Sequence, residues 1–275
     1  MKTQLKAKKH LGQNFLVNKH HQNRVLVEMQ KIVNTKPELP IVEIGVGQGD
    51  LTIEFAKWGR ELKCLEIDTS AYDLVQSKLQ DSPNFEMHLC DALQEISKKP
   101  NYFPSDFVLL SSLPYNVGSR ILVDMAVEYP HINLAVILQR EVGQKVLAKD
   151  ITFFGAFLKL FWTFRNLHII PPSAFLPQPK VYSILISGIS KETNYTHKER
   201  DFIKNVLKRL FVSPNKTLSN NMHNLGMTKE QIDNFFEKHN LPKSTRMCWD
   251  NYKQNLELVI LELNLLEITF DKTTK

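Results

Sequence analysis

The sequence predicts an α/β fold built on a largely parallel sheet, followed by a smaller helical domain. Short apolar segments alternate with amphipathic helical patterns from residue 22 to residue 138, which is typical of strands joined by crossover helices. From about residue 190 the pattern changes to charged helices without a convincing strand. We therefore expect two domains, residues 1–190 and residues 191–275.

The individual elements follow from the spacing of apolar residues. Strands are expected at residues 41–45, 62–67, 85–90, 107–110 and 134–138, with helices at 22–33, 50–58, 72–79 and 119–127. Two further strands are expected at residues 157–164 and 181–189, on either side of a proline-rich segment. In the second domain, helices are expected at residues 198–210, 228–239 and 249–263.

Composition excludes several classes of protein. Of the 275 residues 43% are hydrophobic, which excludes a disordered chain. No run of uncharged apolar residues is long enough to span a membrane. Cys64, Cys90 and Cys248 are an odd number at wide spacing, so neither a disulfide framework nor a metal site is expected. We expect a soluble, cytoplasmic protein.

The net charge of +6 is compatible with a polyanionic partner. Basic residues gather near the N-terminus, at Lys8 and Lys9, and again at Lys204, Lys208 and Arg209. No apolar region follows the first lysines, so no secretory signal is expected. Charge alone leaves open that both groups are simply solvated surfaces.

A glycine-rich segment, Glu-Ile-Gly-Val-Gly-Gln-Gly at residues 43–49, ends the first expected strand and opens a helix. Gly45 and Gly47 allow the backbone to approach a nucleotide-like ligand closely. The spacing does not match the dinucleotide pattern, and the lysine of a phosphate-binding loop is missing. Glu66, at the end of the next strand, can accept both hydroxyls of a ribose. This pair does not distinguish a nicotinamide cofactor from S-adenosylmethionine, and a tight turn followed by a surface acid remains possible.

Polar residues also follow the third and fourth expected strands. Asp91 could accept a hydrogen bond from an adenine amine, or it could be the N-cap of a helix. After the fourth strand, Ser112, Pro114 and Tyr115 combine a polar group, a turn fixed by proline and an aromatic ring. Ligands of open α/β sheets bind at this edge, so the segment could cradle a planar base. A loop with a core-packed tyrosine is the alternative.

Taken together, these segments resemble the ribosomal RNA adenine dimethyltransferases, which comprise the small-subunit rRNA dimethyladenosine transferases and the erythromycin-resistance methylases. The similar segments are residues 12–16, 43–49, 66–68, 91–92, 113–116, 171–181 and 216–221. The last, Lys-Thr-Leu-Ser-Asn-Asn, points to the small-subunit branch. The resemblance covers roughly residues 8–225. It implies a Rossmann-like class I S-adenosylmethionine methyltransferase domain with a smaller C-terminal helical, RNA-binding domain.

The resemblance also implies roles for single residues. It implies that the cofactor, S-adenosylmethionine, is bound by Asn14, Leu16, Gly45, Gly47, Glu66, Asp91 and Ser112. It implies that the target adenine is held by Ser112, Leu113, Pro114, Tyr115 and Phe175, with the two aromatic rings on its faces. With the fold assigned, Lys8, Lys9, Lys204, Lys208 and Arg209 are expected to contact RNA phosphates.

Two positions depart from the family. Ser112 stands where the family carries asparagine, and Tyr182 stands where it usually carries an acid. A serine hydroxyl reaches less far than an asparagine carbonyl and can rotate away. We therefore expect reduced or altered methylation rather than certain loss of activity.

The implied reaction is dimethylation of the N6 amine of two adjacent adenosines near the 3′ end of small-subunit rRNA. The implied partner is the small ribosomal subunit, and a monomer is expected. One alternative is an RNA-binding ribosome assembly factor whose methylation is weak or lost because of Ser112. Another is an adenine methyltransferase acting on DNA or large-subunit rRNA. A nicotinamide dehydrogenase is disfavoured because the third glycine of its pattern is missing.

Overall fold

The computed structural model of the protein describes residues 5–98, 101–148, 152–247 and 252–268. The chain divides into two compact units, Met1–Leu147 with Phe161–Glu192, and Ala148–Leu160 with Thr193–Lys275. The division after residue 192 lies close to the expected boundary of 190/191, but residues 148–160 join the second unit. Each unit is described by itself below.

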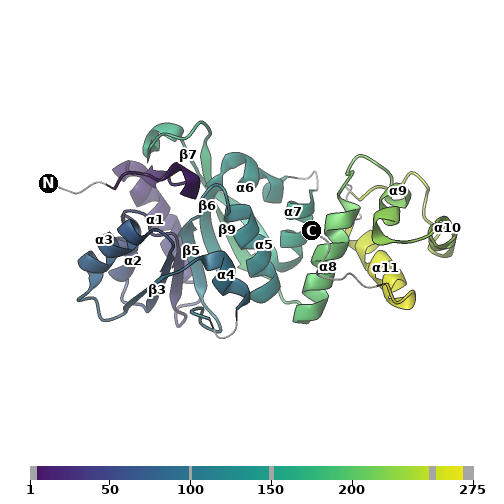
Figure 1. The fold of residues 1–275 in the computed structure, drawn as a ribbon, viewed down its shortest axis with the longest axis horizontal. Coiled ribbons are helices and arrows are strands. Elements are labelled where there is room, and N and C mark those ends of the chain that lie inside the picture. The colour runs from purple at the N-terminus through teal and green to yellow at the C-terminus, as the bar shows by residue number, and fades with distance from the viewer. Residues whose placement is uncertain (1–4, 99–100, 149–151, 248–251, 269–275) are drawn as a thin grey trace. The chain divides into compact units, whose positions relative to one another are not determined.

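A seven-stranded sheet forms the centre of the first unit (Figure 1). Its strands are β2 (Ile41–Ile44), β3 (Leu62–Glu66), β4 (Phe85–Leu89), β5 (Val108–Ser112), β6 (Asn133–Gln139), β7 (Trp162–Ile170) and β9 (Ser183–Ser190). They are ordered β4-β3-β2-β5-β6-β9-β7. The first five in this order pair in parallel, and β9 runs antiparallel to both β6 and β7. The predicted α/β fold with a largely parallel sheet is confirmed.

Helices cover the sheet and connect its strands. They are α1 (Lys19–Val33), α2 (Thr52–Ala56), α3 (Thr69–Leu79), α4 (Ala92–Ser97), α5 (Gly118–Glu128) and α6 (Arg140–Leu147). Side chains of α1, α2 and α3 share one apolar core with Leu185 of β9. A Cβ on Gly143 of α6 would lie 2.4 Å from the neighbouring side chain Ile184. Because successive strand residues point to opposite faces, α6 packs on the other side of the sheet from α1.

The central strands form because their residues are apolar on both faces. Every residue of β2 is buried, as are the first six residues of β6. Continuous apolar runs of this kind are typical of parallel strands covered by helices on both sides. For this reason the expected bounds of β2 and β6 agree with the structure to within one residue.

The strand expected at residues 157–164 is wrong. A helix, α7, covers Phe153–Phe161, and β7 begins only at Trp162. A short apolar run does not distinguish a buried helix from a buried strand by its period. The Trp162 indole is fully buried and donates a hydrogen bond to the carbonyl of Ile132 (2.8 Å), which fixes the start of β7. The short helices α4 and α6 were not expected either.

The N-terminal segment forms a strap, defined here as residues 8–16. It contains a short 3₁₀ helix (Lys9–Leu11) and strand β1 (Phe15–Leu16), which pairs antiparallel with β8 (Phe175–Leu176). Gly12 ends the 3₁₀ helix in the left-handed region at φ +67°, and a Cβ there would lie 2.8 Å from Asn116 Oδ1. Glycine therefore permits both the turn and the close approach of the strap to the chain after β5.

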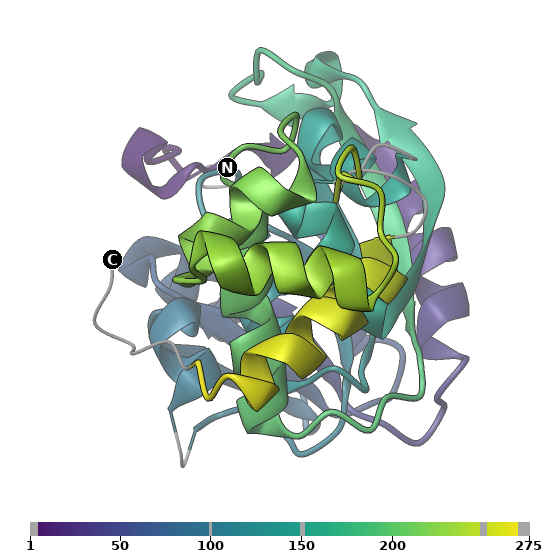
Figure 2. The ribbon, with the colours of Figure 1, turned by 90° about the vertical axis from the view of Figure 1, so that its right-hand side faces the viewer.

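The second unit is helical, as expected (Figure 2). Beside most of α7, it contains α8 (His197–Leu210), α9 (Leu218–Met222), α10 (Lys229–Lys238) and α11 (Tyr252–Leu265). Thr196 and Thr228 begin α8 and α10 as capping boxes, in which the N-cap side chain and the third helical residue satisfy each other's backbone N–H groups. The expected start of the last helix at Trp249, and Cys248, lie outside the described residues.

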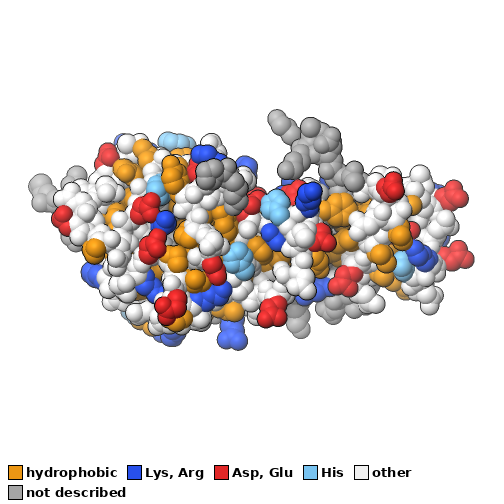
Figure 3. Space-filling model, turned by 90° about the horizontal axis from the view of Figure 1, so that it is seen from below, with side chains coloured by type: hydrophobic (Ala, Val, Ile, Leu, Met, Phe, Trp, Pro, Cys, Tyr) orange, Lys and Arg blue, Asp and Glu red, His pale blue; other side chains and the backbone are white. Residues whose placement is uncertain are grey.

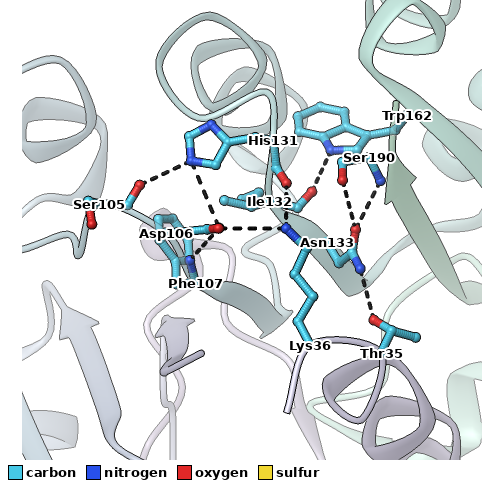
Figure 4. A network of polar contacts seen from close by, with 10 residues as sticks. All are labelled: Thr35, Lys36, Ser105, Asp106, Phe107, His131, Ile132, Asn133, Trp162 and Ser190. Carbon is cyan, nitrogen blue, oxygen red and sulfur yellow. Dashed lines mark hydrogen bonds and ion pairs between the residues drawn. The ribbon is translucent and has the colours of Figure 1, made fainter. Parts of the chain in front are cut away.

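Asn133 joins three elements at the amino end of β6 (Figure 4). Its Oδ1 accepts hydrogen bonds from the backbone N–H (3.0 Å) and hydroxyl (3.1 Å) of Ser190, at the end of β9. Its Nδ2 donates to Thr35 Oγ1 (2.8 Å), just after α1. Asn133 itself is almost completely buried, whereas Thr35 is exposed and Ser190 is half-buried, so removing the amide breaks three hydrogen bonds at a partly solvated junction.

We expect the substitution Asn133→Ala to lower the free energy of unfolding by about 1–3 kcal/mol, because it removes three hydrogen bonds and empties the buried space of the amide. Urea denaturation measures the change. The control is Lys36→Ala, which removes the exposed Lys36–Asp106 ion pair (3.6 Å) and should cost less than about 1 kcal/mol. Equal losses in the two variants would show that the Asn133 network is not a specific constraint.

Candidate functional site

A cavity opens at the carboxyl edge of the parallel strands, where β2, β3 and β5 end. Its walls are the strap (Leu11–Leu16), the glycine loop (Gly45–Gln48), Glu66 with Ile67, and residues 112–115. Its empty volume is about 730 Å³, including the space at its open mouth. This is the edge at which open α/β sheets bind their ligands, and the volume is in the range of small-molecule sites.

The glycine loop lets two segments approach it closely. Gly45 and Gly47 adopt φ values of +77° and +55°, in the left-handed region. A Cβ on Gly47 would lie 3.0 Å from the ring of Phe15, so a side chain there would push against the strap. The loop thus leaves its backbone facing the cavity while the strap packs on it.

Glu66 is a buried carboxylate in the wall of the cavity. Its Oε1 accepts hydrogen bonds from the backbone N–H groups of Ile67 (2.9 Å) and Asp68 (2.8 Å), and its Oε2 accepts from Gly47 (3.2 Å). Burial raises the pKa of Glu66 above its ordinary value, although these three donors favour the ionised form. The predicted ribose-binding acid is therefore fixed against the glycine loop, with lone pairs left for a ligand.

Asp68 fastens the strap to the end of β3. Its almost completely buried side chain accepts hydrogen bonds from Lys8 Nζ (2.6 Å), Gln13 Nε2 (2.8 Å) and the backbone N–H of Ser70 (2.9 Å). Burial opposes ionisation, but these donors outweigh it and lower the pKa of Asp68. Lys8, predicted to contact RNA, has its ammonium group on this carboxylate instead.

The chain after β5 presents two acceptors to the cavity. Ser112 lines it, and among the described residues its hydroxyl has no hydrogen-bond partner. The carbonyl of Pro114 is already committed, because it accepts from the backbone N–H groups of Val117 (3.2 Å) and Gly118 (2.8 Å). Within the described part of the chain, the Leu113 carbonyl accepts no hydrogen bond. Ser112 and Leu113 are therefore the available acceptors.

Of the two predicted stacking aromatics, only Tyr115 lines the cavity. Its hydroxyl is hydrogen-bonded to that of Ser183, the first residue of β9, and burial raises the pKa of Tyr115. Phe175 is 3% exposed and belongs to the apolar core together with Leu16. Phe175 therefore supports the strap from beneath rather than facing the cavity.

The other predicted cofactor residues are partly brought together. Asn14, Leu16, Gly45, Gly47, Glu66 and Ser112 all line the cavity. Asp91 does not. Its Oδ1 accepts from the backbone N–H of Leu93 (2.9 Å) and caps α4, which is the alternative considered from the sequence. Among the described residues, its other oxygen has no partner.

Ile67 and Glu43 are among the cavity residues to which the sequence assigned no role. Ile67 is half exposed although it is a large apolar residue, and its position directly after Glu66 was the only available signal. Glu43 lines the cavity although it is 2% exposed, and Cys64 Sγ lies 3.8 Å from its Oε2. Burial raises the pKa of Glu43 to about 8, so at neutral pH this carboxyl carries its proton.

In the second unit, some of the residues singled out from the sequence are held by contacts within the protein, and others are exposed. Asn221, from the Lys-Thr-Leu-Ser-Asn-Asn segment, is buried and donates to the carbonyl of Ser213 (3.0 Å), so it holds the turn before α9. Lys204 forms an ion pair with Asp201 (2.6 Å). Lys208 is exposed, and Arg209 lies beside it.

The described residues lack two further kinds of feature. They contain no group of three or more His, Cys, Asp or Glu side chains that could hold a metal ion. Likewise, no described helix is both long enough and apolar enough to cross a membrane.

The strand order, the glycine loop, the buried acid after β3 and the turn after β5 define a Rossmann-like methyltransferase fold. A model of the ribosomal RNA adenine dimethylase family matches residues 4–261. The chain belongs to this family, as the sequence motifs indicated. It is thus an rRNA adenine dimethyltransferase, and the family implies the use of S-adenosylmethionine.

Curated relatives of this family are similar in sequence to most of the chain. The ribosomal RNA small subunit methyltransferase A of Helicobacter pylori strain J99 is 33% identical over 267 residues, covering 87% of this chain and 93% of that protein. The protein of the same name from Campylobacter fetus is 32% identical over 249 residues, covering 88% and 90%.

Two solved structures share the fold. A dimethyladenosine transferase from Plasmodium falciparum has a TM-score of 0.70 at 22% identity, covering 94% of this chain and all of that one. The 23S rRNA methyltransferase ErmE has a TM-score of 0.63 at 19% identity, covering 91% of this chain and all of that one.

Glu43 predicts a pH dependence of stability. Its pKa is 4.5 in the unfolded reference and about 8 in the folded protein, so between these values the folded state binds a proton that the unfolded chain has released. Stability from this group is complete below pH 4.5 and is lost as the pH rises to about 8, at up to about 1.4 kcal/mol per pH unit.

The variant Glu43→Gln keeps the shape of the side chain but does not titrate. Urea unfolding at pH 5, 6, 7 and 8 should therefore show a shallower decline in its stability than in the wild type. Parallel declines in the two proteins would contradict a neutral Glu43.

Proposed function

We propose that this protein dimethylates the N6 amines of two adjacent adenosines near the 3′ end of small-subunit rRNA, with S-adenosylmethionine as the methyl donor. The observation that carries the proposal is that a single cavity is lined by both Glu66 and the Ser112–Tyr115 turn. A donor site and a base site therefore adjoin. The names of the relatives, small subunit methyltransferase A, support the choice of substrate.

The residues on the donor side fit S-adenosylmethionine. The fixed Glu66 carboxylate can accept the ribose hydroxyls, and Ile67 and Leu16 offer apolar contact. The open backbone at Gly45 and Gly47, with Asn14 opposite on the strap, leaves room for the amino acid part. The uncommitted oxygen of Asp91 is the proposed acceptor for the adenine amine. When bound, the cofactor supplies a methyl group on a sulfonium ion.

The residues on the base side hold and orient the target amine. An adenine amine is a weak nucleophile because its lone pair is delocalised into the ring. The Leu113 carbonyl and the Ser112 hydroxyl would accept hydrogen bonds from it, which localises the lone pair and aims it along the line of attack. Much of the rate enhancement is therefore positional.

Stacking offsets the cost of extracting the base. Flipping a base out of its stack costs a few kcal/mol, and an aromatic face returns a similar amount. Tyr115 is that face in our proposal, held by Ser183. Phe175 is proposed as the second face, which requires its buried ring to turn toward the cavity.

The proposed partner is the small ribosomal subunit, bound by a monomer in the cytoplasm. Acidic and basic side chains are interspersed on the face shown in Figure 3, so this face does not present a continuous basic surface. Lys9, Lys208 and Arg209 are the proposed phosphate contacts, with Lys8 and Lys204 able to join them on release from their carboxylates. Family membership does not favour an assembly factor without methylation.

The test is transfer of labelled methyl groups to small subunits that lack the modification, with mass spectrometry of the rRNA. We expect two dimethylated adjacent adenosines and binding of S-adenosylmethionine by calorimetry. Glu66→Ala should abolish cofactor binding, whereas Tyr115→Ala should retain it and lose turnover. Binding of both ligands without turnover in the wild type would favour the assembly-factor alternative.

Ser112 limits the reaction in this proposal. Replacing it by asparagine, Ser112→Asn, should raise the initial rate of methyl transfer, because the amide carbonyl reaches further toward the target amine and is a fixed acceptor. The affinity for S-adenosylmethionine, measured by calorimetry, is the control for an intact donor side. Equal initial rates for the two proteins would show that serine serves as well as asparagine.

The basic pair Lys208 and Arg209 predicts a salt dependence. Replacing both by alanine should reduce the slope of log affinity against log salt by about 1–2, because each phosphate contact contributes about 0.7–0.9. Filter binding to small subunits at several salt concentrations measures the slope. The matched control replaces Lys31 and Lys57, which pair with Glu28 and Glu54, and should leave the slope unchanged. An unaltered slope in both double variants would remove Lys208 and Arg209 from the interface.

A further inference from the structure

Tyr182 is an exposed aromatic residue directly before Ser183, whose hydroxyl contacts Tyr115 in the wall of the cavity. Its side chain is 48% exposed, and Leu176 and Val181 in the same segment are also exposed. The segment is anchored at both ends, because β8 pairs with the strap and β9 begins at Ser183. An aromatic ring held in water on an anchored segment indicates a binding surface.

The register of the strands places Tyr182 at the edge where the cavity opens. Ser112 of β5 lies opposite Ile137 of β6, and Gln139 of β6 lies opposite Ser183 of β9. The Ser183 hydroxyl is bonded to that of Tyr115. Tyr182 is therefore the residue directly before the one that holds the stacking tyrosine.

One cation lies near the ring and another lies two residues earlier in the chain. The guanidinium carbon of Arg140 lies 6.0 Å from the ring centroid of Tyr182, and the Arg140 backbone N–H donates to the Tyr182 carbonyl (2.8 Å). Lys180 is exposed two residues earlier. In the described part of the chain, neither Arg140 nor Lys180 forms an ion pair with a carboxylate. Glu141, the residue next to Arg140, pairs with Lys145 instead (3.4 Å). Both positive charges are free for an anion.

We propose that Tyr182, with Arg140 and Lys180, binds the nucleotide adjacent to the target adenosine. This inference rests on the proposed function and adds a residue that determines how the RNA is held. Extracting one adenosine deprives its neighbour of a stacking partner, and the exposed ring of Tyr182 replaces it. The cations contact the phosphates on either side.

The chemistry favours an unpaired nucleotide over a protein surface. An aromatic face between two unpaired cations matches a base between two phosphates, which is the pattern of single-strand binding sites. The acid usual at this position in the family would repel those phosphates, so tyrosine changes the sign of the interaction as well as adding a stacking face.

The test uses the full chain and an RNA stem-loop carrying the two adjacent adenosines, with 2-aminopurine at the neighbour of the target. Emission in the saturated complex should be low for the wild type and for Tyr182→Phe, and higher for Tyr182→Ala. The KM for small subunits should rise about 5- to 30-fold in Tyr182→Ala and remain near the wild-type value in Tyr182→Phe. In both variants kcat and the affinity for S-adenosylmethionine should change little.

The matched control is Tyr102→Ala. Tyr102 is exposed to a similar extent, 43%, but stacks on His88, with ring centroids 3.8 Å apart. It should leave emission and KM unchanged. If the wild type is active and Tyr182→Ala has the same emission and KM as the wild type, this inference is overturned while the proposed function stands. A wild type that neither binds the cofactor nor methylates subunits would instead overturn the proposed function.

Discussion

Two carboxylates after strand β3 hold the candidate site together. Glu66 receives backbone N–H groups from the glycine loop and from its own turn, and Asp68 receives the side chains of Lys8 and Gln13. A buried carboxylate is costly unless donors surround it, so each acid requires the segment that satisfies it. The strap is held over the cavity because Asp68 needs its donors, and the glycine loop is fixed because Glu66 needs Gly47. The walls of the donor side thus depend on the hydrogen bonds that Glu66 and Asp68 accept.

The base side is assembled differently. Strand β9 runs antiparallel between β6 and β7 and brings Ser183 back to the edge at which β5 ends. The Ser183 hydroxyl meets Tyr115, while the Pro114 carbonyl is used to begin α5. The two sides also touch, because Asn116 after β5 donates a hydrogen bond to the carbonyl of His10 in the strap (3.1 Å). The strap therefore links the turn after β3 to the chain after β5.

The sequence predicted the elements whose signals are local. Strands β2 and β6 lie within one residue of their expected bounds, because both are continuous buried runs that are mostly apolar. The segment 157–164 was misassigned to a strand because the period of a short apolar run does not show that its first part is helical. The ion pair between Lys8 and Asp68 joins residues sixty positions apart, and the burial of Phe175 depends on its pairing with the strap. Neither contact can be inferred from a local sequence pattern. Lys8 and Phe175 were therefore recognised as a basic and an aromatic residue, but their contacts with Asp68 and with the strap were not predicted.

The two departures from the family pattern that the sequence shows are Ser112 and Tyr182, whereas Glu66 stands as the resemblance implies. This asymmetry follows from the two kinds of constraint. Glu66 is tied to three backbone N–H groups, so its replacement disturbs the fold as well as the ligand. The Ser112 hydroxyl and the Tyr182 ring have no such ties, since one has no hydrogen-bond partner among the described residues and the other is half exposed. The Ser112 and Tyr182 side chains can therefore be replaced without breaking a side-chain hydrogen bond between described residues, whereas Glu66 cannot.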